Sequence, residues 1–338
     1  NVIQSGGRLN VNGGRLEVSG DYRIQTEKIG SDGTVTYSGS DGYLQMTNAN
    51  DYVKIGGDFL TKAKYSHEGY LTAGTLEIEG DFYQKYSNSS YNFRASGTHK
   101  VILSGSSLQT IWFDNPIYSC FNILEINRTS GAGLSFESGL CFNELITNGC
   151  ILPSVRIKPM NWTLNANEAI SGDLYIDGSI LDLNGYKLEV NGNVIQSGGR
   201  LNVNGGRLEV NGDYRIQTEN IDSGGTVTYS GGSGYLLMTN ANDYVKVGGD
   251  FTTQARNSHE GYLTAGTLEI EGDFYQKYSN SSYNFRAGGT HKVILSGAAA
   301  QNIHFDNPGY SRFNTLLITK PFDSGYSFNT VPVWNKLI

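Results

Sequence analysis

The chain has 338 residues, of which 44 are glycine and 22 are tyrosine, and only 17% are charged. Its formal net charge is −7 without any cluster of Lys and Arg residues, which excludes the basic surface that a nucleic acid or an anionic membrane needs. No apolar run reaches the length of a membrane-spanning helix, so we expect no membrane span in this fragment. Gly, Asn, Ser and Thr alternate with short apolar runs, which indicates many short strands and tight turns.

Residues 1–128 and 193–320 are two copies of one segment, aligned at a constant offset of 192 residues, and they differ at 24 of those 128 positions. We therefore divide the chain into a complete tandem unit, residues 1–192, and a second, incomplete copy, residues 193–338. We expect the second copy to continue the first in one structure. Such a duplication is typical of proteins selected for length, because an active site needs one good copy whereas a fibre or stalk needs many.

A shorter repeat lies inside each tandem unit. The segment 187–190 reads Lys-Leu-Glu-Val, an alternation that predicts a strand with Leu188 and Val190 facing inward. Following this Leu-x-Val anchor along the chain gives the positions Leu16, Val35, Val53, Leu76, Val101, Leu124, Leu145, Leu188 and Leu208. We interpret the longest interval as two turns, with a blurred anchor near 162–164. The unit then has about nine turns of about 21 residues each.

Turns of this length predict an all-β fold, a parallel β-solenoid, in which equivalent residues of successive coils stack about 4.8 Å apart. We expect ladders of Leu181 over Leu201 and Leu188 over Leu208, and an Asn184 to Asn204 ladder joined by side-chain hydrogen bonds. The alternative is an antiparallel meander, because Asn-Gly between alternating apolar runs also predicts a hairpin. The match between residues 20 apart favours the solenoid, since only there do they touch.

The three cysteines can be compared with the second copy. Cys120 corresponds to Arg312 and Cys141 to Val333, while Cys150 lies beyond the end of the second copy. The unit therefore does not depend on a disulfide or a cysteine-ligated metal. We interpret the cysteines as small apolar fillers.

Aspartates recur at predicted turns. Segments 30–33 and 40–42 look like calcium loops, but the second copy moves or loses the carboxylate, so we interpret them as turns and predict no metal site and no cofactor. A Gly-Asp-Phe/Tyr motif recurs six times, and we expect its Asp to cap a corner through its own backbone amides while the ring enters the core. The motifs begin at Gly20, Gly57, Gly80, Gly212, Gly249 and Gly272.

The sequence contains no nucleophile elbow, metal-binding helix or phosphate loop. His67 and His99 recur as His259 and His291, but nothing places a Ser or Cys nucleophile with them. We therefore predict no catalytic residues and no enzymatic activity. Stacked coils can still bring distant carboxylates together, and polysaccharide-cleaving β-helices use paired acids.

Aromatic residues are the better functional signal. The segment 82–93 is repeated without change at 274–285 in one of the longest coils, so we expect it to bulge from the regular cross-section. Its tyrosine rings could stack on sugar faces or on a neighbouring filament, or they could cover their own loop. The candidate binding residues are Tyr83, Tyr86, Tyr91, Tyr275, Tyr278 and Tyr283. A second aromatic segment, 113–122, lies beside Trp112, which becomes His304, so that neighbour is not expected to anchor a specific ligand.

Segments 46–53, 97–105 and 161–164, the last leading into 172–176, resemble repeats of very large secreted or cell-surface β-solenoid proteins of Gram-positive, largely clostridial bacteria. The resemblance covers nearly the whole chain. It implies a secreted or cell-surface location, but it supplies neither a ligand nor functional residues.

Together these features predict an extracellular structural or adhesive repeat element that forms an elongated rod or fibre. Its expected partners are neighbouring repeats and copies of itself, and we expect no nucleic acid. The alternative is a carbohydrate-binding or polysaccharide-cleaving β-helix module, with polysaccharide as the partner.

Overall fold

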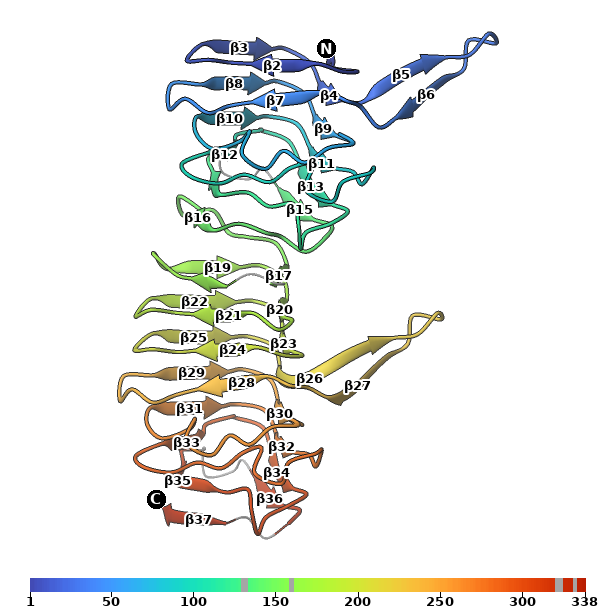
Figure 1. The fold of residues 1–338 in the computed structure, drawn as a ribbon. Helices are drawn as coiled ribbons and strands as arrows, with labels where there is room; N and C mark the ends of the chain where they lie inside the picture. The colour runs from blue at the N-terminus through green and yellow to red at the C-terminus, as the bar shows by residue number, and fades with distance from the viewer. Residues whose placement is uncertain (129–132, 158–160, 320–324, 331–332) are drawn as a thin grey trace. The chain divides into compact units, whose positions relative to one another are not determined.

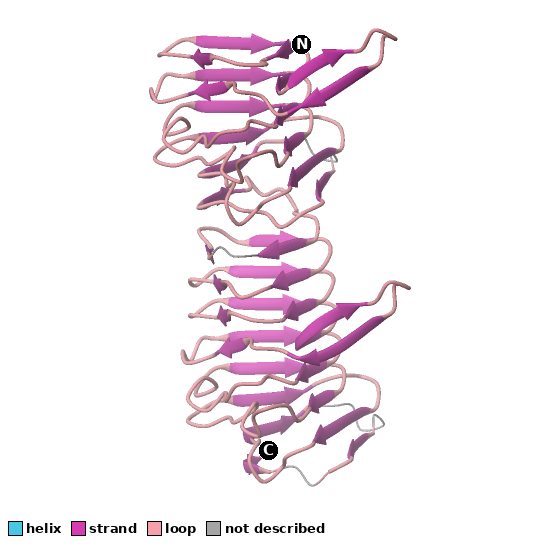
Figure 2. Ribbon diagram, turned by 45° about the vertical axis from the view of Figure 1, so that its right-hand side comes forward, coloured by secondary structure: helices cyan, strands magenta, loops and turns pink. Residues whose placement is uncertain are grey.

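The computed structural model describes residues 1–338 except 129–132, 158–160, 320–324 and 331–332. The described residues form strands and loops, and none of them is helical (Figure 2). They form two compact units, one of Asn1–Pro153 and one of Ser154–Ile157 with Asn161–Ile338. In each unit the chain winds as a parallel β-solenoid (Figure 1), which confirms the predicted fold class. The two units contain about 14 turns of about 23 residues.

In the first unit the coils contribute strands to three sheets, which we call A, B and C. Sheet A contains, in spatial order, β1 (Val2–Ile3), β4 (Tyr22–Ile24), β9 (Phe59–Thr61), β11 (Phe82–Gln84), β13 (Gln109–Phe113) and β15 (Leu134–Phe136). Sheet B contains β2 (Arg8–Asn10) and β7 (Tyr43–Gln45). Sheet C contains β3 (Arg15–Val18), β8 (Tyr52–Ile55), β10 (Thr75–Ile78), β12 (Lys100–Leu103), β14 (Ile123–Ile126) and β16 (Glu144–Ile146).

The second unit repeats this arrangement. Its sheet A contains β17 (Val155–Ile157), β20 (Leu174–Ile176), β23 (Val194–Gln196), β26 (Tyr214–Ile221), β30 (Phe251–Thr253), β32 (Phe274–Gln276), β34 (Gln301–Phe305) and β36 (Tyr326–Phe328). Its sheet B contains β18 (Trp162–Thr163), β21 (Ile180–Asp182), β24 (Arg200–Asn202) and β28 (Tyr235–Leu237). Its sheet C contains β19 (Glu168–Ile170), β22 (Lys187–Val190), β25 (Arg207–Val210), β29 (Tyr244–Val247), β31 (Thr267–Ile270), β33 (Lys292–Leu295), β35 (Phe313–Ile318) and β37 (Trp334–Leu337).

The strand register confirms the predicted ladders. Leu181 pairs with Leu201 and Leu188 pairs with Leu208, both in parallel strands and all fully buried. The alternative, an antiparallel meander, is therefore excluded for the coils. The repeat boundary between residues 192 and 193 lies inside the second unit, where β22 and β25 pair in register across it. The solenoid continues through this boundary without a break.

Two of the predicted anchors are wrong. Val35 lies in an antiparallel hairpin, and Leu16 pairs directly with Val53, so residues 16–53 form a single long coil. The other wrong anchor is the blurred one near 162–164: the residue that pairs with Leu188 is Glu168, whereas Trp162 belongs to sheet B. The mean coil is consequently about 23 residues rather than 21, and a 192-residue repeat corresponds to about eight coils rather than nine.

The hairpins are insertions in otherwise regular coils. In the first unit, β5 (Thr26–Ile29) pairs antiparallel with β6 (Val35–Ser38). In the second unit, the end of β26 pairs antiparallel with β27 (Val227–Gly231). Both ribbons project from their units (Figures 1 and 2). The Asp32 carboxylate accepts a hydrogen bond from the backbone N–H of Thr34 inside the first hairpin's turn, so this aspartate acts as a turn residue.

The Asn-Gly pairs form corners between sheets instead of hairpins. Asn12 and Gly13 both have positive φ (51° and 78°) and connect β2 in sheet B to β3 in sheet C. Asparagine enters this left-handed region more readily than most side chains. The expected amide ladder is wrong in its partners, because Asn204 Nδ2 donates to Asp182 Oδ1 (3.0 Å) and Asn184 Nδ2 donates to the Leu164 carbonyl (3.1 Å).

The Gly-Asp-Phe/Tyr motifs build a ladder along sheet A. As predicted, the rings enter the core: Phe59 and Phe82 are buried and stack with centroids 5.7 Å apart. The aspartates cap the backbone of the neighbouring coil, not their own as expected. Asp21 Oδ1 accepts the Asp58 N–H (3.0 Å), and Asp58 Oδ1 accepts the Asp81 N–H (2.9 Å). The same contacts recur in the second unit, and we call this column the aspartate ladder.

The cysteine prediction is wrong for two of the three residues. Cys120 and Cys141 are joined by a disulfide, with their Cα atoms 4.8 Å apart and a separation of 21 positions in sequence. They occupy equivalent places in adjacent coils, so stacking brings them together. The comparison with Arg312 and Val333 shows only that the second copy lacks this bond. Cys150 is a free thiol.

This disulfide makes the first unit sensitive to reductant. We expect reduction to lower the free energy of unfolding of the first unit by about 2–4 kcal/mol, because the open chain gains conformational entropy. Urea unfolding with and without reductant measures the change. A Cys120→Ser/Cys141→Ser variant should not respond to reductant, and a Cys150→Ser variant should respond like the wild type. An equal response of all three proteins would contradict the assignment.

Four buried histidines make stability depend on pH. Burial lowers the pKa of His67 and His259 to about 4 and that of His99 and His291 to about 3. In the unfolded chain each pKa is near 6.5, so the unfolded state binds protons that the folded state excludes. Stability is therefore complete above about pH 6.5 and is lost as the pH falls toward 4.

We expect each histidine to contribute up to about 1.4 kcal/mol of lost stability per pH unit in this window. Replacing His99 and His291 by leucine should roughly halve the histidine part of the slope, because two of the four buried histidines are removed. The exchange should leave no polar group unpaired, since neither ring nitrogen of either residue has a hydrogen-bond partner among the described residues. Urea unfolding between about pH 7 and pH 5, above most carboxyl pKa values, measures this slope. A flat wild-type profile would show that the histidines are not held neutral.

Candidate functional site

The predicted aromatic segment 82–93 consists of β11 and a fixed loop that follows it. The buried Asn92 holds it from inside: its Nδ2 donates to two backbone carbonyls, one of them that of Lys85 (2.8 Å). Gln84 Nε2 donates in turn to Asn92 Oδ1 (2.7 Å). Asn284 makes the same contacts in the second unit. The loop therefore presents its outward rings in defined places.

The predicted tyrosines occupy three different settings on this loop. Tyr83, on the outer face of β11, donates to Asp81 (2.7 Å), and burial together with this bond raises its pKa to about 12. Tyr91 packs against Tyr118 with centroids 5.1 Å apart. Tyr86 is 54% exposed. The corresponding residues of the second unit are Tyr275, Tyr283 and Tyr278. Of the six, Tyr86 and Tyr278 offer the most exposed rings.

A carboxylate from the next coil closes the loop. Asp114 accepts hydrogen bonds from the backbone N–H of Tyr86 (2.7 Å) and from the indole of Trp112 (2.6 Å). In the second unit His304 takes the place of the tryptophan, and its Nε2 lies 2.7 Å from Asp306 Oδ1. Both rings thus bind the same loop carboxylate, so the exchange keeps a structural contact.

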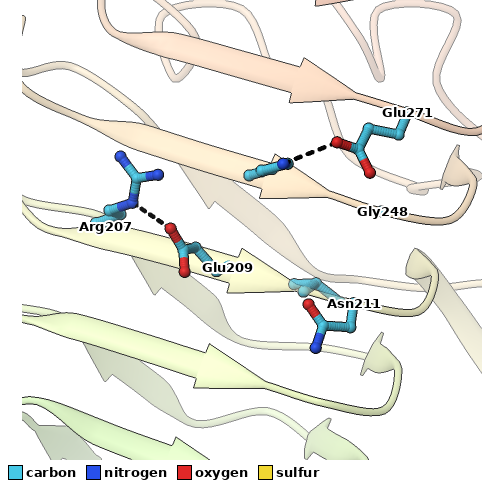
Figure 3. Close-up of a pocket in the computed structure, with 7 residues that line it drawn as sticks. Arg207, Glu209, Asn211, Gly248 and Glu271 are labelled. Atoms are coloured by element: carbon cyan, nitrogen blue, oxygen red, sulfur yellow. Dashed lines mark hydrogen bonds and ion pairs between the residues drawn. The ribbon is translucent and has the colours of Figure 1, made fainter. Parts of the chain in front are cut away.

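The outer face of sheet C in the second unit holds a shallow polar pocket (Figure 3). Alternate residues of a strand face the same side of the sheet, so Arg207 and Glu209 of β25 both point outward. Residues of the next two coils complete the lining. Arg207 Nε lies 2.5 Å from Glu209 Oε1, and Lys246 Nζ lies 2.8 Å from Glu271 Oε1. The lining residues are Arg207, Glu209, Val210, Asn211, Lys246, Gly248 and Glu271. The first unit has the corresponding pairs Arg15 with Glu17 and Lys54 with Glu79.

Two glutamates on the outer faces of the C sheets have lowered pKa values, Glu209 in the second unit and Glu77 in the first. A hydrogen bond from Lys187 lowers the pKa of Glu209, with help from Arg207, although burial opposes the shift. Burial alone would raise the pKa of Glu77, but its hydrogen bonds, led by those from Tyr52 and Lys54, together outweigh burial and lower it. A general acid needs the opposite shift. These glutamates are therefore suited to pairing with cations.

One carboxyl group of the aspartate ladder behaves differently. Burial raises the pKa of Asp250, and the neighbouring charges of Asp213 and Asp273 add to the effect. Its Oδ1 accepts the Asp273 N–H (2.8 Å), which partly opposes the rise. Because this oxygen accepts a hydrogen bond from the backbone of the next coil, the Asp250 carboxyl group has a structural role in the aspartate ladder.

Sequence reasoning missed the hairpins, which carry exposed apolar side chains. Ile29 is 69% exposed and Ile221 is 64% exposed. The signal was present in the sequence: two alternating runs, 26–29 and 35–38, flank a turn rich in glycine, which is the pattern of a hairpin. It was obscured because Val35 also falls close to the coil period.

Comparison with protein-family models, curated proteins and solved structures finds no match for this chain. Within the described ranges, no group of three or more His, Cys, Asp or Glu side chains could hold a metal ion. No helix in the described part of the chain is long and apolar enough to cross a membrane. The functional assignment therefore depends on the geometry of the solenoid, its outer faces and its hairpins.

Proposed function

We propose that this chain is a structural repeat element of an extracellular or cell-surface fibre, lengthened by copying a 192-residue unit. The observation that carries the proposal is the pairing of β22 with β25 across the repeat boundary. Because one copy joins the next through the same ladders that join coils within a copy, each duplication extends the scaffold without new contacts.

The disulfide supports an extracellular location. Bonds of this kind persist in oxidising compartments and are rare in the cytosol of most organisms. The Cys120–Cys141 bond joins two adjacent coils of the first unit. It agrees with the secreted or cell-surface setting that the resemblance to clostridial-type repeat proteins implies.

The charged faces favour a structural role over a hydrolytic one. Adjacent coils do place acids together, as polysaccharide-cleaving β-helices require. Here, however, Glu209 is paired with Lys187 and Arg207, and Glu271 with Lys246. Such pairs stabilise the outer face of a stack modestly, and for Glu209 the pairing lowers the pKa, whereas proton donation needs a raised one.

A chain lengthened by one further copy of residues 1–192 tests this proposal. About eight coils at about 4.8 Å each should add about 38 Å to the length of the particle. Electron microscopy of chains with zero, one and two added copies measures the increment. Separate globules, or a length that does not increase in proportion to the number of copies, would rule out a continuous scaffold.

A carbohydrate-binding module is the second candidate, favoured by the exposed Tyr86 and Tyr278 on their fixed loops. Sugar faces stack on such rings. This function predicts binding to at least one polysaccharide on a glycan array, and at least a tenfold loss in a Tyr86→Ala/Tyr278→Ala variant, about 1.4 kcal/mol. Tyr83→Phe/Tyr275→Phe is the matched control, since these rings keep their packing. If no polysaccharide on the array binds, the carbohydrate-binding function is excluded and the structural role is the remaining candidate.

A further inference from the structure

Among the described residues, each unit carries one amphipathic hairpin. In the first unit, the cross-strand pairs Ile29 with Val35 and Glu27 with Tyr37 define one face of the ribbon. The pairs Lys28 with Thr36 and Thr26 with Ser38 define the other. The first face is mainly apolar and the second is polar, and we call the first the hairpin face.

The hairpin face is open to solvent in both units. Ile29, Val35 and Tyr37 are 69%, 44% and 43% exposed. Their counterparts are equally open: the exposed fractions of Ile221, Val227 and Tyr229 are 64%, 46% and 38%. A two-stranded ribbon is at best marginally stable in water, and it gains stability by covering such a face.

The two copies differ in this region only off the hairpin face. Lys28 corresponds to Asn220 on the polar face, and Gly30 and Asp32 correspond to Asp222 and Gly224 in the turn. Ile29, Val35 and Tyr37 are unchanged. The charged and turn residues have therefore varied around a constant apolar surface.

We propose that the hairpin face packs against the hairpin face of a second copy of this chain. This inference rests on the proposed structural function, because it gives the lateral contact of the scaffold. The face is self-complementary: β-branched and tyrosine side chains of two ribbons can interdigitate as in a sheet-on-sheet contact. It also carries one acidic group, Glu27 or Glu219, which pairs across the ribbon with Tyr37 or Tyr229.

The area of the face decides between one contact and several. The exposed parts of the three side chains amount to roughly 300 Å² per hairpin, so one pair of hairpins buries roughly 600 Å², below the roughly 1,200 Å² of a stable interface. Two pairs reach that limit. The partner must therefore offer one matching face for every 192-residue unit, and a second copy of the chain does so. Multivalency then strengthens the contact with each added unit.

Sedimentation equilibrium of the 338-residue chain, up to about 1 mM, tests the inference. The wild type should associate reversibly. A variant with Ile29→Ser, Val35→Thr and Tyr37→Ser, and the same changes at Ile221, Val227 and Tyr229, should associate at least about tenfold more weakly. Changing one hairpin alone should already remove most of the association. Lys28→Ser/Thr36→Ser, with Asn220→Ser/Thr228→Ser, is the matched control on the polar face.

A wild type that stays monomeric at every concentration would overturn the proposal, and so would an equal loss in the polar-face control. In either case the increase of length with added copies could still hold, so failure here is distinct from failure of the structural role. Oxidative cross-linking gives a second test in a Cys150→Ser background. Val35→Cys should form disulfide-linked dimers and Thr36→Cys should not; the reverse result would place the contact on the other face.

Discussion

The structure depends on one constraint: each residue lies over its equivalent in the next coil, one strand spacing away. In the core this constraint stacks Leu188 over Leu208 and Phe59 over Phe82. Burial of such columns stabilises the stack by about 25 cal/mol per Å² of apolar surface removed from water. The disulfide between coils is another consequence, since stacked Cα atoms fall within bonding range. The residues that a side chain contacts are therefore set more by its position in the coil than by the residues next to it in sequence.

The same constraint brings like charges together. Carboxylates about 5 Å apart repel by about 1 kcal/mol in water and about 3 kcal/mol at an effective dielectric of 20, while a hydrogen bond to a charged group contributes about 1.5–3 kcal/mol. The two effects are of similar size in the aspartate ladder. This balance explains why Asn193, which is neutral, occupies one position of the column and why Arg215 pairs with Asp213 at the next. Burial raises the pKa of Asp250, which lies between two other aspartates, and the remaining repulsion adds to the rise.

Periodicity was enough to predict the parallel solenoid and the inward residues, because the pattern at Leu181 and Leu188 repeats wherever coils touch. It failed where a local change left the pattern intact. Val35 continues the apolar alternation inside a hairpin, and the buried Glu168 occupies a position where an apolar anchor was expected. The disulfide was missed because Cys120 was compared with the second copy instead of with the residue one coil away. The tyrosine settings depend on loop contacts, such as those of Asn92, that no period encodes.

The hairpins are inserted without disturbing the stacking of the coils. Leu16 pairs with Val53 and Leu208 with Val245 in unbroken register, although each coil contains an inserted ribbon. The insertion leaves the stack unchanged because both ends of the ribbon return to the same corner of the coil, and its outer residues are free to vary without cost to the core. Copying the unit therefore adds a fixed number of coils and one ribbon together. Under the proposed pairing of hairpin faces, reach and the number of lateral contacts increase in proportion, so a longer chain would hold its neighbours more strongly than a shorter one.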